Sequence, residues 1–451
     1  MKDSGNRWIG KIPESWESMR VRHVIKSDAD GIRVGPFGSS LKEAILEDGI
    51  SDYKVYGQAN LIRHNFEYGD NYVTEKDFRR LKNYEIKAGD VLLSMMGTIG
   101  KCSVVPNEIK TGIMDSHLIK IRLDDTVNPA FFEYVYEHSG VVYEQLVLGS
   151  NGSTMNGLNS TIVKNTYIPV PPLSEQHVIA AYLDRKCGQI DDIIADLQRQ
   201  IARLESYKKS LISEVVTKGL NPDVQMKDSG ARCVGKIPVH WSVSRIKYLM
   251  DGEHPYPIGD GDHGLIKSDD YLEEGIPYIR VLNLTWGRGL CLDDIVYISD
   301  DMNSMIKNSE LKPGDLLIAK TGATIGKTAI VPEWIPIANT TSHVGKITMP
   351  KNQCAEFFYH VLNSDIVQKQ IEDLSAMQST RPELGIEGLK NLTVTVPPLK
   401  EQQAIATYLD RKCAEIDTIL DDKRRQVENM KNHRKSVIYE YVTGKKRVKE
   451  V

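Results

Sequence analysis

Apolar side chains recur every three to four residues along two long stretches of the chain, 174–218 and 400–444. In the first stretch the repeating positions are Leu183, Cys187, Ile190, Ile194, Leu197, Ile201, Leu204, Lys208, Leu211 and Val215. In the second they are Leu409, Cys413, Ile416, Leu420, Lys423, Val427, Met430, Arg434, Val437 and Tyr441. Such a 3.5-residue repeat, held over more than three heptads, is typical of a helix packed along its length on another helix. The pattern predicts two long helices that pair antiparallel, with Lys208, Lys423 and Arg434 interrupting the apolar seam.

These two stretches belong to a repeat that covers the whole chain. Residues 1–5 recur as 226–230, and Trp16 recurs as Trp241, so the offset is 225 early in the chain and 226 later. The other matching segments are 10–13 with 235–238, 89–93 with 314–318, 98–101 with 324–327, 116–117 with 342–343, 131–132 with 357–358, 170–173 with 396–399, and 182–187 with 408–413. Two copies are too few for a solenoid. The repeat predicts two units, each a globular part followed by a helix, related by a pseudo-twofold axis.

The globular part of each unit has the pattern of a mixed α/β domain. Segments 51–62 and 276–285 are rich in β-branched and aromatic residues and predict strands. Helices are expected at 128–148 and 354–374, each followed by a polar loop, 149–156 and 375–381. A Pro-Pro pair then precedes each long helix, where proline ends the preceding element. The expected boundaries are 1–173, 174–219, 220–399 and 400–444, with a basic tail at 445–451.

Composition narrows the class of protein. The chain has 451 residues, of which 41% are hydrophobic, so packed cores are expected. It has no run of 18 apolar residues and its N-terminus lacks the apolar core of a signal peptide, so we expect no membrane span and a cytoplasmic location. The six cysteines form no CxxC pair and are expected as reduced thiols. The net charge of −4 argues only mildly against nucleic-acid binding, which needs local basic charge.

Two glycine-rich segments imitate nucleotide-binding motifs. Segment 259–264 fits GxGxxG, but its two aspartates would face a pyrophosphate and prolines stand where a strand is needed. Segment 322–328 resembles a P-loop, but it lacks the first glycine and precedes a β-rich segment instead of a helix. The sequence also shows no metal-ligand spacing, no NPPF-type methyltransferase motif and no nuclease carboxylate pair. We therefore expect no catalytic residues, no metal and no cofactor in this chain.

Three motifs, each present twice, carry a resemblance to a known family. They are KDSG-x4-GKIP-x2-W, GD-x-LL followed by TIGK, and PPL-x-EQ followed by YLDRK and a long helix. In this order and at this spacing they resemble the specificity subunits of type I restriction–modification systems, over essentially the full chain. The resemblance implies two target-recognition domains, at 1–173 and 220–399. It also implies that the two helices are spacers, known as the central and C-terminal conserved regions.

The resemblance further implies a function. Each target-recognition domain would read one half of a bipartite target in double-stranded DNA, while the helices set the spacing between the halves. Two modification subunits would dock there and bring S-adenosylmethionine and adenine-N6 methyltransferase chemistry, and restriction subunits would bring ATP and Mg. This chain itself would be non-catalytic. Two other readings stay open: an enzyme with its own methyltransferase or nuclease site, and a coiled-coil scaffold that binds only protein.

Side chains that read bases are chiefly polar or basic, and phosphate contacts position the protein without specifying sequence. In the first domain the DNA-contact candidates are Ser39, Ser40, Lys42, Gln58, Asn60, Arg63, Lys101, Ser116, His117, Asn151, Thr154 and Asn156. In the second domain they are His263, Lys267, Arg280, Asn283, Arg288, Lys320, Thr321, Lys327, Ser342, His343, Gln378, Ser379 and Arg381. Apolar residues off the seam are candidates for docking partner helices, namely Ile193, Tyr207, Ile212, Val216, Ile405, Ile419 and Ile438.

Overall fold

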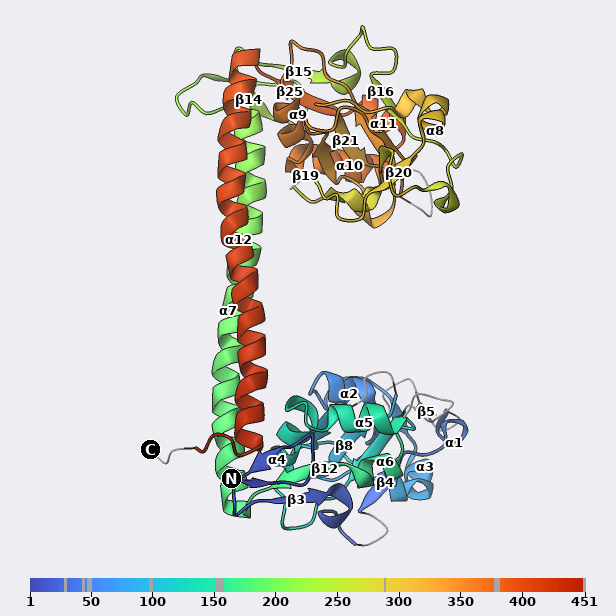
Figure 1. The fold of residues 1–451 in the computed structure, drawn as a ribbon, viewed down its shortest axis with the longest axis vertical. Helices are drawn as coiled ribbons and strands as arrows, with labels where there is room; N and C mark the ends of the chain where they lie inside the picture. Colours follow the sequence, from blue (N-terminus) through green and yellow to red (C-terminus); the bar gives the residue numbers. More distant parts are fainter. Residues whose placement is uncertain are drawn as a thin grey trace. The chain divides into compact units, whose positions relative to one another are not determined.

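The computed structural model describes residues 1–27, 31–42, 45–46, 51–96, 100–150, 158–287, 289–376 and 382–448. The chain divides into two compact units, residues 1–198 with 425–451, and residues 199–424. Each unit contains one globular domain and part of both long helices (Figure 1). Within the described residues, no helix is both long and apolar enough to cross a membrane.

The long helices are α7, Leu173–Lys218, and α12, Leu399–Val442. In the first unit the ring of Tyr182 on α7 lies 4.5 Å from that of Tyr441 on α12, and Asp191 Oδ1 lies 3.1 Å from Arg434 Nε. In the second unit Glu205 Oε1 lies 2.7 Å from Arg424 Nη2, and Asp417 pairs with Lys208. Rising numbers on α7 meet falling numbers on α12 in each unit. The predicted antiparallel helix pairing is confirmed.

The seam between the helices is apolar with polar interruptions. The seam positions other than the three cations are all buried or half-buried, the half-buried ones being Ile194, Ile201, Leu204, Leu211, Met430 and Tyr441. Each interrupting cation has a partner on the other helix: Lys208 pairs with Asp417, Arg434 with Asp191, and Lys423 with Gln200. A charge in a seam is tolerated when it is paired and hydrogen-bonded.

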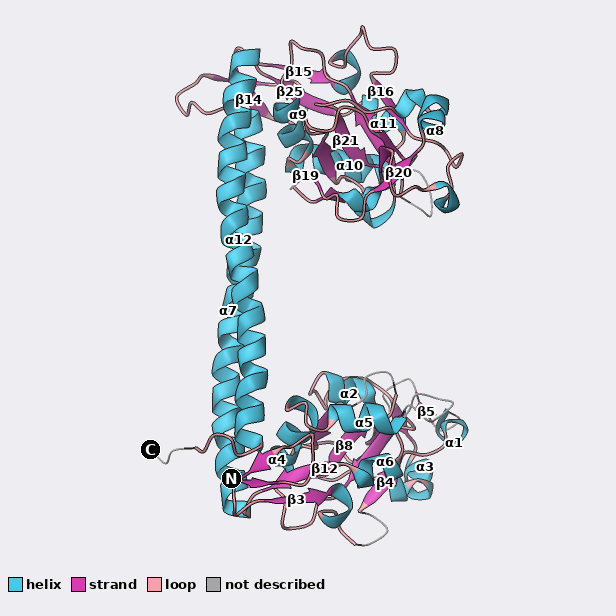
Figure 2. Ribbon diagram, in the orientation of Figure 1, coloured by secondary structure: helices cyan, strands magenta, loops and turns pink. Residues whose placement is uncertain are grey.

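Short strands and helices build the first globular domain. The strands are β1 Lys2–Asp3, β2 Lys11–Ile12, β3 Glu17–Arg20, β4 Ile32–Val34, β5 Ile45–Leu46, β6 Tyr53–Tyr56, β7 Tyr72–Val73, β8 Val91–Ser94, β9 Cys102–Val104, β10 Gly112–Met114, β11 Leu118–Ile121 and β12 Tyr167–Val170. The helices are α1 Gly38–Lys42, α2 Gln58–Ile62, α3 Glu75–Arg80, α4 Pro129–Glu133, α5 Tyr143–Ser150 and α6 Ser160–Asn165. The main sheet has the antiparallel order β4-β11-β8-β9, and a mixed sheet has the order β10-β6-β7-β5 (Figure 2).

The second globular domain has matching strands and helices. The strands are β13 Met226–Asp228, β14 Lys236–Pro238, β15 Ser242–Arg245, β16 Ile258–Asp260, β17 Ile276–Ile279, β18 Leu284–Thr285, β19 Gly289–Leu290, β20 Val296–Ile298, β21 Leu316–Ala319, β22 Thr328–Ile330, β23 Asn339–Thr340, β24 Val344–Ile347 and β25 Thr393–Val396. The helices are α8 Asp300–Met305, α9 Ala355–Leu362, α10 Asp365–Ala376 and α11 Ile386–Lys390. Its main sheet, β16-β24-β21-β22, repeats the order of the first domain.

The smaller sheets repeat as well. Strand β6 pairs parallel with β10 and antiparallel with β7, as β17 does with β23 and β20. Strands β3 and β12 pair antiparallel in the first domain, as β15 and β25 do in the second. The mixed α/β class and the internal repeat are therefore confirmed as a repeat of topology as well as of sequence.

The core of each unit combines the globular domain with both helices. In the first unit Trp16 and Phe131 share a cluster with Leu183 of α7 and with Val437, Ile438 and Val442 of α12. In the second unit Trp241 and Phe357 pack in one cluster with Ile212 of α7 and Leu409 of α12. Each domain is thus held to the helix pair by a continuous apolar core.

Some predicted elements are wrong in extent. The strand expected at 51–62 ends at Tyr56, because Gly57 starts a helical turn in which its N–H donates to Asn60 Oδ1 at 2.9 Å. The strand expected at 276–285 is split into β17 and β18 by a 3₁₀ turn at Val281–Asn283.

The helices expected at 128–148 and 354–374 are both interrupted. The first passes from α4 into a π-helical turn at Tyr134–His138 and stops before Gly140, which has φ +76. The second breaks between α9 and α10, where Ser364 Oγ donates to Val361 O at 2.6 Å and competes with the helical bonds.

Candidate nucleic-acid interface

Helix α2 and the end of strand β8 meet at one edge of the first domain. The Gln58 side-chain amide, on α2, donates to Ser94 Oγ and to Met96 O, each at 2.9 Å. The backbone of Leu158, which follows the undescribed segment 151–157, donates to Met95 O at 2.9 Å. The second predicted loop and the chain leaving the third therefore reach the same edge.

The predicted pair Ser116 and His117 lies at this edge too. The N–H of Met95 donates to His117 O at 2.9 Å, and a Cβ added at Gly38, the first residue of α1, would lie 3.8 Å from Ser116 Oγ. Helix α1, which carries the exposed Ser39 and the half-buried Ser40, thus begins beside this pair. The structure thus brings the first two predicted loops together with Leu158, the residue that follows the undescribed third loop.

Asp115 stabilises this turn. Only its neighbours Ser116 and His117 were predicted from the sequence as DNA contacts. Its Oδ1 accepts the N–H of His117 at 2.8 Å, and burial raises the pKa of its carboxyl. The order Asp-Ser-His suggests a catalytic triad, but Ser116 Oγ and Asp115 Oδ2 both approach the same ring nitrogen of His117, Nδ1. A relay needs the two ring nitrogens to serve different partners. This turn therefore offers hydrogen-bonding groups rather than an activated nucleophile.

The corresponding edge of the second domain has the same backbone contacts with different side chains. The N–H of Lys320 donates to His343 O at 2.8 Å, and the N–H of Leu384 donates to Lys320 O at 2.8 Å. Thr321 Oγ1 lies 3.1 Å from His343 Nδ1. His343 is exposed, while Thr321 and Ser342 are half-buried. These contacts correspond to those of Met95, His117 and Leu158 in the first domain.

Asp260 is the organising carboxylate of the second edge. Its Oδ1 lies 3.1 Å from Nε2 of the exposed His263, and its Oδ2 accepts from Lys320 Nζ. Lys320 is buried, so its ammonium is used inside the domain. The structure therefore gives Lys320 an ion-pair partner within the domain, and its contact with DNA stays a prediction. The sequence offered no signal for this pair, because its members lie 60 residues apart.

Two predicted asparagines are structural as well. Asn60 is buried, and its Nδ2 donates to Asn65 O at 3.0 Å and to Tyr68 O at 2.7 Å. Asn283 is buried in the equivalent turn, where Oδ1 accepts from the N–H of Arg280 at 2.9 Å and Nδ2 donates to Cys291 O at 3.0 Å. These amides already close the turns that they cap, and their contacts with DNA stay a prediction.

The predicted basic residues differ in how far their charges already have partners within the protein. Lys101 Nζ lies 2.6 Å from Glu137 Oε1, and the Arg63 guanidinium lies 4.2 Å above the ring of Tyr68. The Arg280 guanidinium lies 5.5 Å from the Tyr271 ring centre and also donates to Asp294 O. Lys267 is exposed and Lys327 is half-buried. Among the predicted cations whose side chains the structure describes, Arg63, Lys267 and Lys327 have no ion-pair partner and can approach a phosphate.

Several predicted DNA contacts lie outside the described residues. These are Asn151, Thr154, Asn156, Arg288, Gln378, Ser379 and Arg381. The backbone of Lys42 ends α1, and its side chain also lies outside the described part.

The proposed outer face of the helices is smaller than expected. Ile212, Val216, Ile405 and Ile438 are buried in the cores beneath the globular domains, so their prediction as a docking surface is wrong. The exposed members are Ile193 at 48%, Tyr207 at 57% and Ile419 at 45%. Ile193 and Ile419 occupy equivalent positions in the two repeats.

One polar cluster in the first unit was missed by sequence reasoning. Ligand atoms of His64, Glu137 and His138 lie within 4.8 Å of one another, as in a metal site. However, Lys101 occupies Glu137 Oε1, and an ammonium there opposes a second cation. Burial alone would raise the pKa of Glu137, but contacts with His64 and Lys101 lower it to about 2, while burial lowers the pKa of His138 to about 4. The negative charge of Glu137 is thus balanced by the residues around it.

Comparison with known proteins identifies the family. A family model described as "Type I restriction modification DNA specificity domain" matches twice, over residues 38–203 and 261–429. The type I restriction enzyme MjaVIII specificity subunit of Methanocaldococcus jannaschii is 24% identical over 451 residues, covering 98% of this chain and 95% of the relative. The EcoBI specificity subunit of Escherichia coli is 24% identical over 373 residues, covering 80% and 75%.

Solved structures share the fold. A chain from a study of complex assembly and conformational transition of the type I R-M system matches with a TM-score of 0.69 at 16% identity, covering 96% of this chain and 98% of that one. The HsdS subunit of Thermoanaerobacter tengcongensis matches with a TM-score of 0.50 at 16% identity and the same coverage. Because the family model matches both repeats over more than half of the sequence, this chain belongs to the type I restriction–modification DNA specificity family.

Proposed function

We propose that this chain is the non-catalytic specificity subunit of a type I restriction–modification complex. Each globular domain reads one half of a bipartite DNA target. The pair of long helices sets the spacing between the halves and docks the modification subunits. The chain needs no cofactor of its own in this scheme.

One observation carries the proposal: two domains of equal topology present different side chains at the same edge. Matching backbone contacts, Leu158 to Met95 and Leu384 to Lys320, support both edges. Both edges carry the repeated Ser-His pair, Ser116–His117 and Ser342–His343. The first edge adds Gln58, whereas the second adds Thr321 and His263. A shared scaffold with different hydrogen-bond donors and acceptors suits the reading of two different base sequences.

The partners follow from this role. Two modification subunits would supply S-adenosylmethionine and adenine-N6 methylation, and restriction subunits would supply ATP- and Mg-dependent translocation and cleavage. The exposed Ile193 and Ile419, one on each helix, are docking candidates because apolar side chains on an exposed helix face favour a partner. Action on cellular DNA would place the complex in the cytoplasm.

Methylome sequencing of a host that carries the modification subunit, with and without this chain, tests the proposal. We expect a split motif of two short halves separated by a fixed gap, and we expect it to vanish when this chain is deleted. Replacing residues 20–165 by the corresponding segment of another family member should change one half only.

Two other outcomes would overturn the proposal. Contiguous methylation, or methylation that persists without this chain, would favour a protein-binding scaffold. Methylation of DNA by the purified chain with S-adenosylmethionine alone would make the chain itself an enzyme.

A further inference from the structure

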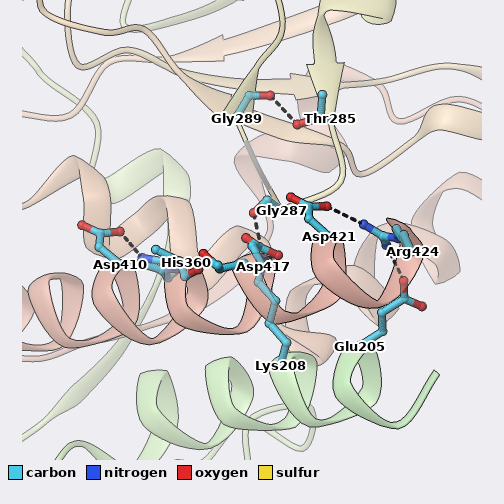
Figure 3. A network of polar contacts seen from close by, with 12 residues as sticks. Glu205, Lys208, Thr285, Gly287, Gly289, His360, Asp410, Asp417, Asp421 and Arg424 are labelled. Carbon is cyan, nitrogen blue, oxygen red and sulfur yellow. Dashed lines mark hydrogen bonds and ion pairs between the residues drawn. The ribbon is translucent and has the colours of Figure 1, made fainter. Parts of the chain in front are cut away.

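Lys208 joins three parts of the second unit through one ammonium group. Its Nζ donates to Asp417 Oδ1 at 2.8 Å and Oδ2 at 2.7 Å, which links α7 to α12. It also lies 3.2 Å from Gly287 O in the second globular domain (Figure 3). A lysine ammonium has three N–H donors, so these three acceptors use all of them. The side chain of Lys208 is only 11% exposed, which strengthens each interaction.

Gly287 belongs to a hairpin that its own domain anchors at the start. Gly287 lies in the turn of the hairpin formed by β18 and β19, where Thr285 Oγ1 donates to Gly289 O at 2.8 Å. Leu284, at the start of this hairpin, is fully buried in a core cluster. Gly287 itself has φ +65, a conformation that fixes the direction of the turn. A contact at this carbonyl therefore positions the domain and not merely a loose loop.

A cavity lies beside this contact and is lined by polar and apolar side chains. This cavity of about 560 Å³ separates the hairpin from the helices, and its lining includes Lys208, Trp286, Asn363 and Asp417. Trp286, the neighbour of Gly287, is 55% exposed. The apolar core holds the base of the domain to the helices, and the ammonium of Lys208 adds a polar contact between the hairpin and the helix pair.

The equivalent cation of the first unit lacks this third contact. Arg434 corresponds to Lys208 in the repeat and pairs with Asp191, the counterpart of Asp417. Among the residues that the structure describes in the first domain, none accepts a hydrogen bond from Arg434. The link from the seam to a globular domain is therefore a feature of the second unit.

We propose that Lys208 is a positioning residue: it fixes the second recognition domain on the helix pair and thereby sets how strictly the complex measures the distance between the two half-sites. This inference rests on the proposed function. It assigns a spacing role to a residue that has no expected contact with DNA.

Methylation of a spacer series by the assembled complex tests the inference. Substrates carry the two half-sites separated by the natural gap, or by gaps one base pair shorter and longer. In the parent complex we expect methylation almost only at the natural gap. Lys208→Met keeps the length of the side chain but removes its donors, and should raise the relative rate on the altered gaps about tenfold, the equivalent of one charged hydrogen bond. The preferred half-site sequences should stay unchanged.

Matched variants separate positioning from general loosening. Lys208→Arg retains charge and donors and should restore the parent selectivity. Arg424→Gln removes an ion pair with Glu205 on the same two helices. Arg424 lines the same cavity, but its hydrogen-bond partners among the described residues are Glu205 and Asp421 on the helices, so the variant should leave selectivity unchanged. If Lys208→Met does not assemble, Asp417→Asn weakens the same ammonium site and is judged by the same ratio.

The outcomes are decisive for Lys208. Parent-like gap selectivity in an active Lys208→Met complex, or equal relaxation in Arg424→Gln, would overturn the inference. An altered half-site sequence would also overturn it, since that would indicate base reading rather than positioning. Failure of the proposed function is visible separately, because the parent complex would then show no split target.

Discussion

The indole N–H of Trp16 donates to Oε2 of Glu175 at 2.9 Å, and Trp241 makes the same bond to Glu401 at 2.9 Å. Each bond ties the opening motif of a repeat to the first turn of a long helix in the same unit. Each tryptophan is fully buried, so its N–H depends on this one carboxylate. In each repeat, the tryptophan of the opening motif and the glutamate of the long helix are therefore the donor and acceptor of the same hydrogen bond.

Removing the acceptor should destabilise the first unit. In Glu175→Ala the buried indole N–H of Trp16 loses its partner, and we expect the free energy of unfolding to fall by about 1–3 kcal/mol. Urea unfolding monitored by tryptophan fluorescence measures the change, with the exposed Asp192→Ala on the same helix as the control. In a Trp16→Phe background the cost of Glu175→Ala should largely vanish, and an unchanged cost there would contradict the pairing.

Two glycines that follow the long helices should respond unequally to alanine. Gly219 and Gly444 follow the two long helices with φ +77 and +68, where a Cβ costs about 1 kcal/mol. An added Cβ at Gly444 would lie 2.4 Å from Pro13 Cδ, whereas at Gly219 the nearest atom is Trp241 Cζ2 at 3.2 Å. Thermal unfolding should show a clearly larger loss for Gly444→Ala than for Gly219→Ala. Equal losses would mean that Pro13 yields without cost.

The cysteines should differ sharply in reactivity. Cys233 is exposed, whereas Cys102, Cys187 and Cys413 are buried, and burial raises the pKa of the Cys413 thiol to about 11. Because the thiolate is the reactive form, a disulfide reagent added to the native protein should modify Cys233 first. The buried thiols should react only with urea present. Labelling of Cys187 in the native protein would contradict its seam position.

Acid should weaken the first unit through His138. Burial lowers the pKa of this imidazole to about 4, so between pH 6.5 and 4 the unfolded chain binds a proton that the folded chain does not. The resulting stability is complete above pH 6.5 and is lost as the pH falls, by up to about 1.4 kcal/mol per pH unit. Unfolding measured across this range should show a shallower slope for His138→Gln than for the parent. A slope in His138→Gln equal to that of the parent would contradict burial of this imidazole as the cause.

Charge reversal should separate two lysines that the sequence places in equivalent motifs. Lys327→Glu should weaken DNA binding by the assembled complex and reduce the salt dependence by about one phosphate contact. Lys351→Glu, an exposed lysine of the same domain, serves as the control. Lys101→Glu should instead lower stability, because it places a second carboxylate beside Glu137. Unchanged DNA affinity in Lys327→Glu would remove Lys327 from the interface.

Periodicity and repetition predicted the parts of the fold that depend on local pattern. The seam from Leu183 to Val215 follows from one helical face, and the offset of 225 to 226 residues pairs the elements of the two domains. Short strands such as β5 and β7, of two residues each, carry no such pattern. The break near Gly140 was not predicted, because a single glycine after an apolar run does not by itself end a helix.

The candidate interface was harder to predict because burial decides which polar groups remain free. Lysine is a residue type that often contacts phosphate, yet Lys320 is paired with Asp260 inside the domain. Asparagine is a residue type that often contacts bases, yet the side chains of Asn60 and Asn283 each close the turn in which they lie. Such assignments depend on contacts between distant segments, which one sequence without a structure does not reveal.

The shared core of the first unit has a consequence for biosynthesis. Val437, Ile438 and Val442, near the end of α12, pack with Trp16 and Leu183 in one cluster. The ribosome therefore makes the entire second domain before the first can complete its core. Until then the nascent chain exposes apolar surface that chaperones or partner subunits can cover. If translation stopped before residue 437, the first domain would lack the part of its core that α12 supplies, even though all of its own strands had been made.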